Sequence, residues 1–259
     1  MRAMKDIILK VENLGINFGG LQALQGFNFE LHREELVGLI GPNGSGKTTV
    51  FNLLTGIYKP ITGAIYLESK KMNGCSTYQF VEAGMARTFQ NIKLFDDCSV
   101  LENVMVAVHK EQTYRLKDVL FHTRTYKKEE EDYKYRAFGI LKIMGLEEKA
   151  NLYARQLSYG EQRKLEIARA IATDAKVLLL DEPAAGMNPT ETQELVECIR
   201  LIREKFHLAI LLIEHDMNLV MNLCEKLYVL DCGNTIAVGE PSEIATNPEV
   251  IASYLGKEY

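Results

Sequence analysis

The chain has 259 residues, of which 47% are hydrophobic and 25% charged, a composition typical of one large folded domain or one domain with a smaller subdomain. The formal net charge of −5 leaves no basic excess for the phosphate backbone, so nucleic acid is excluded as a main partner. The longest apolar runs, 177–180 and 208–213, are far shorter than the roughly 20 residues that span a bilayer, so any membrane role must come through partners.

The N-terminal part of the chain is predicted to be mostly strands. In residues 26–32 (GFNFELH), apolar and polar side chains alternate, which is the period of a strand with one buried face. Residues 63–69 (GAIYLES) alternate in the same way. Such alternation is typical of an antiparallel sheet with one face toward water. Residues 1–15 contain no long apolar stretch, so we expect no signal peptide there.

A phosphate-binding loop is predicted next. Residues 36–40 (LVGLI) are apolar without alternation, as in a strand buried on both faces of a parallel sheet. Residues 41–48 (GPNGSGKT) match G-x-x-x-x-G-K-[ST] and open a helical pattern, which is the setting that this motif requires. Glycines let several backbone N–H groups face phosphate oxygens, and the helix N-terminus adds positive charge. We expect nucleotide to bind at Gly41, Pro42, Asn43, Gly44, Ser45, Gly46, Lys47, Thr48 and Thr49.

Two side chains of this loop have expected roles. Lys47 should reach the β- and γ-phosphates, and the Thr48 hydroxyl should be offered to Mg²⁺. The alternative is a glycine-rich turn before an ordinary helix, which the strand before and the helix after disfavour. The loop by itself indicates a nucleotide and leaves the reaction open.

Residues 75–155 are predicted to be mainly helical. The charge run at 127–132 (KKEEED) is interpreted as the solvated face of a helix. The apolar residues beyond it recur at helical spacing. They are Tyr133, Ala137, Ile140, Leu141 and Met144.

A second helix should begin at Ser158. Glu161 follows three residues later, and this pair forms a capping box. Apolar residues then form one stripe of the helix. They are Leu165, Ala168, Ile171 and Ala172. A capped helix start that contains glycine can also bind an anion, although the pattern alone fits an ordinary well-capped helix equally well.

An acidic pair follows a second buried strand, VLLLD at 177–181. In P-loop proteins an aspartate at this place holds Mg²⁺ through the second coordination shell, which would be the role of Asp181. The neighbouring Glu182 could polarise the attacking water. Alternatively, the Asp-Glu-Pro triplet merely opens a loop, a reading that the upstream phosphate-binding loop disfavours.

The rest of the chain continues the alternation of strands and helices. Residues 192–206 have a helical pattern, and 208–213 (LAILLI) read as another buried strand. Residues 226–239 are predicted to form two strands around a turn at 231–234. This alternation predicts an α/β core with helices on both faces of the sheet.

Together these segments identify a family. Residues 157–170 (LSYGEQRKLEIARA) resemble the signature segment of the ABC transporter ATPases. The phosphate-binding loop, TFQN at 88–91, VLLLDEP and IEHD at 213–216 occur in the same order as in that family. The chain therefore resembles a complete ABC ATP-binding domain over nearly its whole length.

The resemblance implies an architecture. It is an α/β fold with a P-loop NTPase core around a mixed or parallel sheet, an N-terminal antiparallel β subdomain and a helical subdomain. The whole chain, 1–259, would be a single domain. Residues 1–74 and 156–259 would form the ATP-binding core with its β subdomain, and 75–155 the helical subdomain. A family insertion would occupy roughly 109–135 within it.

The resemblance also assigns residues that a second subunit would complete. In the family, the signature helix meets the γ-phosphate bound to the other subunit, which would be the role of Ser158, Gly160 and Glu161. Tyr159 replaces the usual glycine but leaves that serine and glycine in place. Asn188 stands where the family often has an aspartate that couples the two ATP sites, and an amide loses its charge.

Three further roles come from the resemblance. Gln90 would contact Mg²⁺ or the water and connect to the transmembrane domains, and His215 would contact the γ-phosphate. As lone residues they would be a surface glutamine and a structural histidine, and the order of motifs favours function. Phe18 would stack on adenine, with a buried core phenylalanine as the alternative.

Within the family, the branched-chain amino acid importers of the Liv type are the most similar. The segments that carry this likeness are DEPAAGMNP, the region from Ala86 to Ala107, the insertion and the ending NPEVIASYLG. Urea or amide importers and the lipopolysaccharide-export ATPase are near relatives, and the latter lacks the insertion. A GTPase would need an N-K-x-D motif, which is absent, and a non-transport ABC protein usually carries two cassettes or long coiled coils.

The resemblance finally implies partners and a place in the cell. ATP would bind between two ATP-binding subunits arranged head to tail. The pair could be a homodimer, but Liv-type systems use two different ATP-binding subunits, so a heterodimer is expected. These would drive transmembrane permease subunits and serve, indirectly, an extracytoplasmic solute-binding protein. The chain would then lie on the cytoplasmic face of the cell membrane, with ATP and Mg²⁺ as its ligands.

Overall fold

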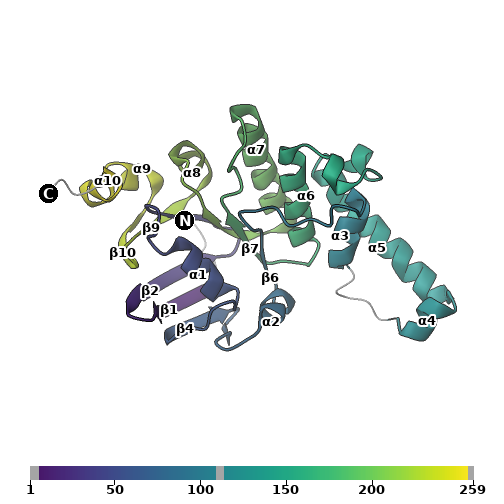
Figure 1. The fold of residues 1–259 in the computed structure, drawn as a ribbon, viewed down its shortest axis with the longest axis horizontal. Helices are drawn as coiled ribbons and strands as arrows, with labels where there is room; N and C mark the ends of the chain where they lie inside the picture. Colours follow the sequence, from purple (N-terminus) through teal and green to yellow (C-terminus); the bar gives the residue numbers. More distant parts are fainter. Residues whose placement is uncertain (1–5, 109–113, 256–259) are drawn as a thin grey trace.

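The computed structural model describes residues 6–108 and 114–255, and Figure 1 shows two sheets with helices around them. The smaller sheet is antiparallel and has four strands in the order β2-β1-β4-β5. They are β1 (Ile7–Phe18), β2 (Leu21–His32), β4 (Thr62–Leu67) and β5 (Lys70–Lys71). The predicted alternation is confirmed on β2, where Phe27, Phe29 and Leu31 are buried.

The larger sheet has six strands in the order β10-β9-β3-β8-β7-β6. All neighbours are parallel except β10, which runs antiparallel to β9. Their bounds are β3 (Leu36–Ile40), β6 (Met85–Arg87), β7 (Val177–Asp181), β8 (Ala209–Ile213), β9 (Lys226–Asp231) and β10 (Asn234–Gly239). The predicted α/β fold with a mixed, largely parallel sheet is therefore confirmed.

Helices connect these strands. They are α1 (Lys47–Leu54), α2 (Thr77–Glu82), α3 (Val100–Val108), α4 (Leu116–Leu120), α5 (Arg124–Ile143), α6 (Tyr159–Ile171), α7 (Pro189–Phe206), α8 (Met217–Leu223), α9 (Pro241–Ala245) and α10 (Pro248–Leu255). Two short 3₁₀ turns, Glu147–Lys149 and Ala154–Gln156, lead from α5 to α6. Within the described residues, every helix is too short or too polar to span a bilayer.

Two apolar cores lie on opposite faces of the larger sheet. The antiparallel sheet and α1 cover one face, and α6, α7 and α8 cover the other (Figure 1). Strand β3 contributes to both, since Leu36 and Ile40 join one core while Val37 and Leu39 join the other. Burial on both faces explains why this strand is apolar without alternation.

One short strand lies within the region that the sequence predicts to be mainly helical. Residues 75–87, which we grouped with the helical region, contain α2 and the edge strand β6 of the larger sheet. A three-residue strand is too short to show a period of two, so its pairing with β7 leaves no sequence pattern. The subdomain boundary at residue 75 stays a prediction.

The helical region is built on α3, α5 and α6. Tyr133, Ala137 and Leu141 are the buried residues of α5. The part of α5 before Tyr133 carries α4 at its end and projects away from the sheets (Figure 1). The first five residues of the predicted insertion, 109–113, lie outside the described residues.

Candidate nucleotide-binding site

The phosphate-binding loop lies between β3 and α1 and has a backbone that requires glycine. Gly41 has a φ of 148°, and a Cβ atom there would lie 2.0 Å from the carbonyl oxygen of Leu230. Gly46 precedes the first residue of α1 in a left-handed conformation with a φ of 109°. Side chains are strained in this region of φ, so the curled loop depends on these glycines.

Lys47 lies inside this loop and is only 8% exposed. Its Nζ donates hydrogen bonds to the carbonyl oxygens of Gly41 (2.8 Å) and Pro42 (2.9 Å). Burial lowers the pKa of Lys47, and the nearby charges of Glu182 and Asp181 oppose that effect.

The loop offers further groups to an anion. Ser45 Oγ is buried and has no hydrogen-bond partner within the part of the chain that the structure describes. Thr48 is exposed at the first turn of α1. An ammonium group, an unpaired hydroxyl and a helix N-terminus together fit the phosphates of a nucleotide.

Asp181 lies at the end of β7 and is almost fully buried. Its Oδ2 accepts a hydrogen bond from Arg87 Nη2 at 2.7 Å, and both side chains are 7% exposed. No pattern in the sequence marks Arg87, a lone arginine on β6, as part of the site. It is the first of the site residues that sequence reasoning missed.

Glu182, Gln90 and His215 meet beside this aspartate. Gln90 Nε2 donates a hydrogen bond to Glu182 Oε2 at 2.8 Å. His215 Nδ1 lies 3.8 Å from the same oxygen. Glu182 has a left-handed φ of 45°, and its N–H donates to the carbonyl oxygen of Ile213 at 2.9 Å. The Glu182 side chain is thereby turned toward the groups that follow β6 and β8.

The order of strands explains this meeting. Strands β6, β7 and β8 are parallel neighbours, so their carboxyl ends lie at one edge of the sheet. Gln90 follows β6, Glu182 follows β7 and His215 follows β8. Residues far apart in the sequence are therefore brought to one place, and each was predicted as part of the site.

Comparisons with known proteins agree with this geometry. The sequence model of the ABC transporter family matches residues 24–185, and that of the branched-chain amino acid ATP-binding cassette transporters matches 234–259. The high-affinity branched-chain amino acid transport ATP-binding protein LivG of Escherichia coli K12 is 46% identical over 98% of this chain and 100% of its own. The corresponding protein BraF of Pseudomonas aeruginosa is 42% identical over the same shares.

A solved structure agrees as well. The ADP conformation of MJ1267, an ATP-binding cassette of an ABC transporter, has a TM-score of 0.84 at 32% identity and covers 97% of this chain and 100% of its own. The chain belongs to the ABC transporter ATP-binding family. It is accordingly an ATPase that binds nucleotide as the ATP-binding subunit of an ABC transporter.

The signature helix of this ABC subunit begins as predicted. Ser158 Oγ accepts a hydrogen bond from the Glu161 N–H at 3.4 Å, and Glu161 Oε2 accepts one from the Ser158 N–H at 3.0 Å. Burial acts to raise the pKa of Glu161, but hydrogen bonds from Lys149 and Ser158 outweigh it and lower that pKa. No hydrogen bond among the described residues joins Ser158, Gly160 or Glu161 to the phosphate-binding loop.

Phe18 lies at the end of β1. It is 43% exposed, so it is not the buried core residue that was the alternative. Its ring stands edge-on to Tyr58, with the centroids 5.1 Å apart. Adenine stacking remains a prediction.

The ABC subunit also contains a buried ion pair that sequence reasoning missed. Arg163 is fully buried, and its Nη1 lies 2.7 Å from Glu166 Oε2. Burial raises the pKa of Glu166, and the charge of Arg163 opposes that effect. A charged pair three residues apart on a helix is usually exposed, so only the fold reveals its burial.

The Arg163–Glu166 ion pair holds residues 89–93, which we call the Gln90 segment. Arg163 donates to the carbonyl oxygens of Phe89 (2.7 Å) and Gln90 (2.8 Å). Glu166 accepts from the N–H groups of Phe89 (3.3 Å) and Lys93 (3.4 Å). The signature helix and this segment are therefore joined through backbone groups on both sides of Gln90.

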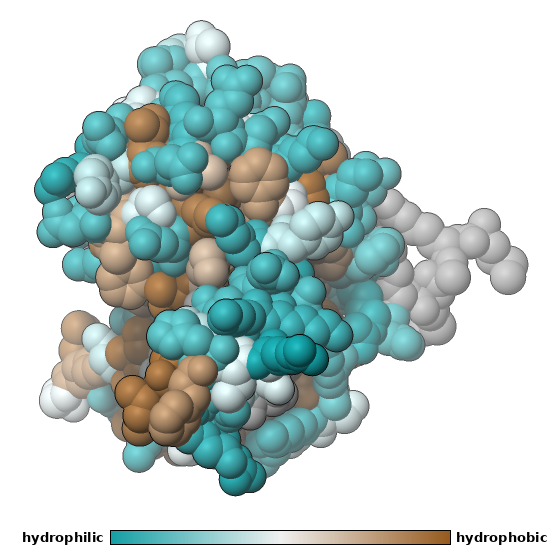
Figure 2. Space-filling model, turned by 90° about the vertical axis from the view of Figure 1, so that its right-hand side faces the viewer, coloured by the Kyte–Doolittle hydropathy of each residue, from teal (hydrophilic) through white to brown (hydrophobic). Residues whose placement is uncertain are grey.

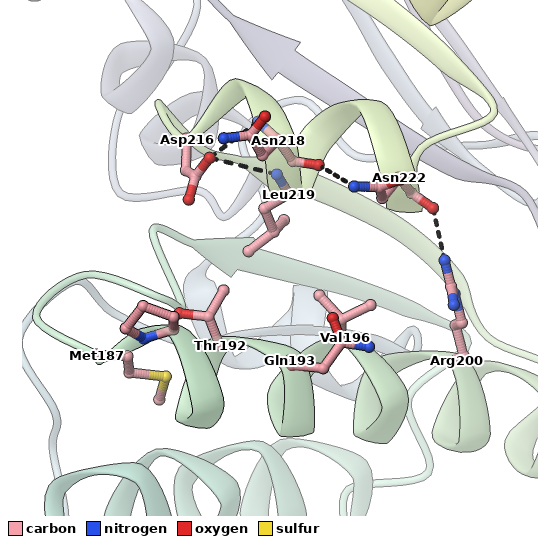
Figure 3. A pocket seen from close by; sticks show the side chains of 10 residues that line it. Met187, Thr192, Gln193, Val196, Arg200, Asp216, Asn218, Leu219 and Asn222 are labelled. Atoms are coloured by element: carbon pink, nitrogen blue, oxygen red, sulfur yellow. Dashed lines mark hydrogen bonds between the residues drawn. The ribbon is translucent and has the colours of Figure 1, made fainter.

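A separate cavity of about 490 Å³ lies between α7 and α8 (Figure 3). Arg200 donates to the carbonyl oxygen of Asn222 at 2.6 Å and closes one end. Met187 and Asp216 line the cavity, and each is one residue from a predicted site residue, Asn188 or His215. None of the catalytic residues predicted for this ABC subunit lines it, so it is distinct from the nucleotide site.

Proposed function

We propose that this chain hydrolyses ATP to power the uptake of branched-chain amino acids through a membrane permease. The substrate rests on the relatives, since LivG and BraF are both high-affinity branched-chain amino acid transport ATP-binding proteins. The match at residues 234–259 to the branched-chain family supports the same solute. The chemical role rests on one observation in the structure, the convergence of Gln90, Glu182 and His215 beside the phosphate-binding loop.

The residues at the carboxyl edge of the larger sheet would each have a different role in hydrolysis. Lys47 would bind the β- and γ-phosphates in place of its present carbonyl partners. Glu182 would take a proton from the attacking water, and His215 would bind the γ-phosphate. Gln90 already donates to Glu182 and would help to orient the carboxylate and the water.

Three oxygen donors of this chain would hold Mg²⁺ beside the phosphates. Thr48 is exposed on the first turn of α1, and Asp181 ends β7, so a hydroxyl and a carboxylate are both available, with Gln90 as a third oxygen donor. When bound, Mg²⁺ neutralises charge on the phosphates. Arg87 would keep the Asp181 carboxylate oriented.

The site is proposed to be completed by a second subunit. Ser158, Gly160 and Glu161 form the capped start of α6, where Ser158 is exposed and could bind the γ-phosphate held by a partner arranged head to tail. ATP would then close the dimer and hydrolysis would release it, and this motion would reach the permease through the Gln90 segment. An extracytoplasmic solute-binding protein would deliver the solute, and the subunit would work on the cytoplasmic face of the membrane.

Reconstituted transport tests this proposal. The chain, its partner ATPase and the permease subunits would be placed in liposomes with the solute-binding protein from the same gene neighbourhood. ATP should drive uptake of labelled leucine, and Glu182→Gln should bind ATP and dimerise stably but barely turn over, because its amide cannot accept the proton. ATP-driven uptake of urea or an amide without leucine would overturn the solute assignment. Normal turnover by Glu182→Gln would reject Glu182 as the base.

A further inference from the structure

The end of the helical region carries apolar side chains that nothing in the described chain covers. We call residues 114–128 the insertion arm; they comprise α4, the turn after it and the first residues of α5. Helix α4 has no buried residue. Leu116 is 85% exposed, Leu120 72% and Phe121 74%, values among the highest for large apolar residues in the described chain. Monomeric proteins rarely leave such a group in water unless it binds something.

The backbone of the arm is held in place by its own contacts. The rings of Tyr114 and Tyr126 pack edge to face at 5.1 Å, and Tyr114 donates a hydrogen bond to Glu130 Oε1 at 2.7 Å. Asp118 Oδ2 accepts from the Arg115 N–H at 2.9 Å, which fixes the start of α4. The exposed leucines and phenylalanine are therefore presented by an ordered turn.

The arm is strongly basic in a chain of net charge −5. Asp118 is the one acidic residue between positions 114 and 128. The basic residues are Arg115, Lys117, Arg124, Lys127 and Lys128, all exposed. Within the described residues none of the five forms an ion pair. Figure 2 looks onto this end of the molecule and shows brown apolar groups beside teal charged ones.

We propose that the insertion arm binds an anionic lipid surface. Exposed leucine and phenylalanine side chains flanked by lysine and arginine are suited to the boundary between headgroups and acyl chains. The basic residues would be attracted to acidic headgroups, while the apolar residues would enter the boundary. A second copy of the chain is disfavoured as the occupant, because a two-fold contact would set this positive arm against the same positive arm.

The acidic run that follows the arm does not cancel this attraction. Residues 129–132 are all acidic but lie further along α5 toward the body of the protein. Glu129 accepts a hydrogen bond from Tyr133 at 3.1 Å, and Glu130 accepts the one from Tyr114. A surface touched by α4 and its turn would meet the basic residues first.

Vesicle co-sedimentation of the purified full chain tests the proposal. The probes are vesicles of phosphatidylcholine alone and of phosphatidylcholine mixed with phosphatidylglycerol. We expect strong binding to the anionic vesicles, weak binding to the neutral ones and loss of binding as salt rises. Lys127→Ser with Lys128→Ser should weaken partition by roughly tenfold or more, since each basic residue near an anionic surface contributes about fivefold. Leu120→Ser with Phe121→Ser should weaken it as well.

Matched variants elsewhere on the surface serve as controls. Lys70→Ser with Lys71→Ser removes two exposed charges from β5, and Ile57→Ser with Ile61→Ser removes two exposed apolar residues. Both should bind vesicles like the unaltered chain. Equal sedimentation of arm variants and controls, or equal binding to neutral and anionic vesicles, would overturn the proposal. Failure of the unaltered chain to bind vesicles would also overturn it. If the arm variants at the same time no longer co-purified with the permease, the partner of the arm would be a protein.

This inference goes beyond the proposed function and is separable from it. No residue of the nucleotide site lies in the arm, so ATPase activity in solution should stay unchanged in every variant. Intact hydrolysis with no lipid binding would reject the arm proposal alone. Lipid binding without hydrolysis would reject the proposed function alone.

Discussion

Lys47 shows how a single residue is prepared for its ligand. Its ammonium group is buried in the loop and held by two carbonyl oxygens. Burial of a charge is costly, and this cost lowers the pKa of the lysine. A phosphate would replace neutral dipoles with a full negative charge at the same place. Part of the free-energy cost of removing the Lys47 ammonium group from water is therefore already met when the chain folds, before nucleotide binds.

Lys47→Met should weaken ATP binding. Loss of a charge-assisted hydrogen bond costs about 1.5–3 kcal/mol, or roughly ten- to a hundredfold in Kd. Titration of fluorescent ATP measures the effect. Lys59→Met, which removes an exposed lysine, is the control and should leave affinity unchanged. Equal affinities in the two variants would remove the phosphate-binding loop from the proposed site.

The difference in stability between the unaltered chain and Lys47→Met should depend on pH. Because the pKa of Lys47 is lowered, the folded chain binds fewer protons than the unfolded chain between that lowered pKa and 10.5. Stability of the unaltered chain therefore rises with pH across this window, relative to Lys47→Met. Urea unfolding at neutral and alkaline pH should show the difference between the two shifting in favour of the unaltered chain. A difference independent of pH would mean that the lysine is not buried in solution.

The signature helix and the Gln90 segment act as one element. Arg163 and Glu166 contact backbone groups on both sides of Gln90, and Gln90 contacts Glu182. We expect a displacement of α6 to reach the carboxylate that would activate water. The contacts of Arg163 and Glu166 are made to backbone atoms of the segment, whereas the contact with Glu182 depends on the Gln90 side chain.

Removal of the buried pair separates its effect on stability from its effect on activity. Arg163→Met should destabilise the chain by about 3–5 kcal/mol, since Glu166 is left buried without a partner. Arg163→Met with Glu166→Leu should recover most of that stability, because two apolar residues replace the pair. ATPase turnover of the double variant should stay low, since the Gln90 segment is no longer held. Normal turnover in a stable double variant would show that the pair is only structural.

At the scale of the whole molecule, we propose that each chain supplies two halves of different sites. The phosphate-binding loop and Glu182 lie at the carboxyl edge of the larger sheet, while the exposed Ser158 caps the start of α6 and, among the described residues, has no hydrogen bond to that loop. A single chain therefore brings together the groups for binding and for water activation, but not the proposed cap of the γ-phosphate.

A negative charge introduced at the cap tests this arrangement. Glu182→Gln should form an ATP-dependent dimer, and the addition of Ser158→Asp should abolish it. Aspartate still caps the helix but repels the phosphate. Glu182→Gln with Ser76→Asp alters the cap of α2 instead and should still dimerise. Light scattering gives the mass, with the partner ATPase added if this chain does not self-associate, and thermal melting checks the fold. Undiminished dimers of the Ser158→Asp variant would contradict the proposal.

The sequence alone determined the features that depend on local physics. Strands β3 and β7 coincide with uninterrupted apolar runs, since burial on both faces leaves no polar position. The capped start of α6 and the glycine-dependent loop follow from neighbouring residues only. The likeness to the ABC ATPases then assigned Gln90 and His215 their places in the site.

Only the tertiary structure decided what depends on distant partners. Arg87 and Asp181 are far apart in the chain and meet because β6 and β7 are neighbours. Arg163 is a charged residue that a helix would normally turn to water, and its burial depends on carbonyl groups of the Gln90 segment. Local patterns record which residues avoid water. They do not indicate which polar groups from other parts of the chain lie close enough to stabilise a buried charge.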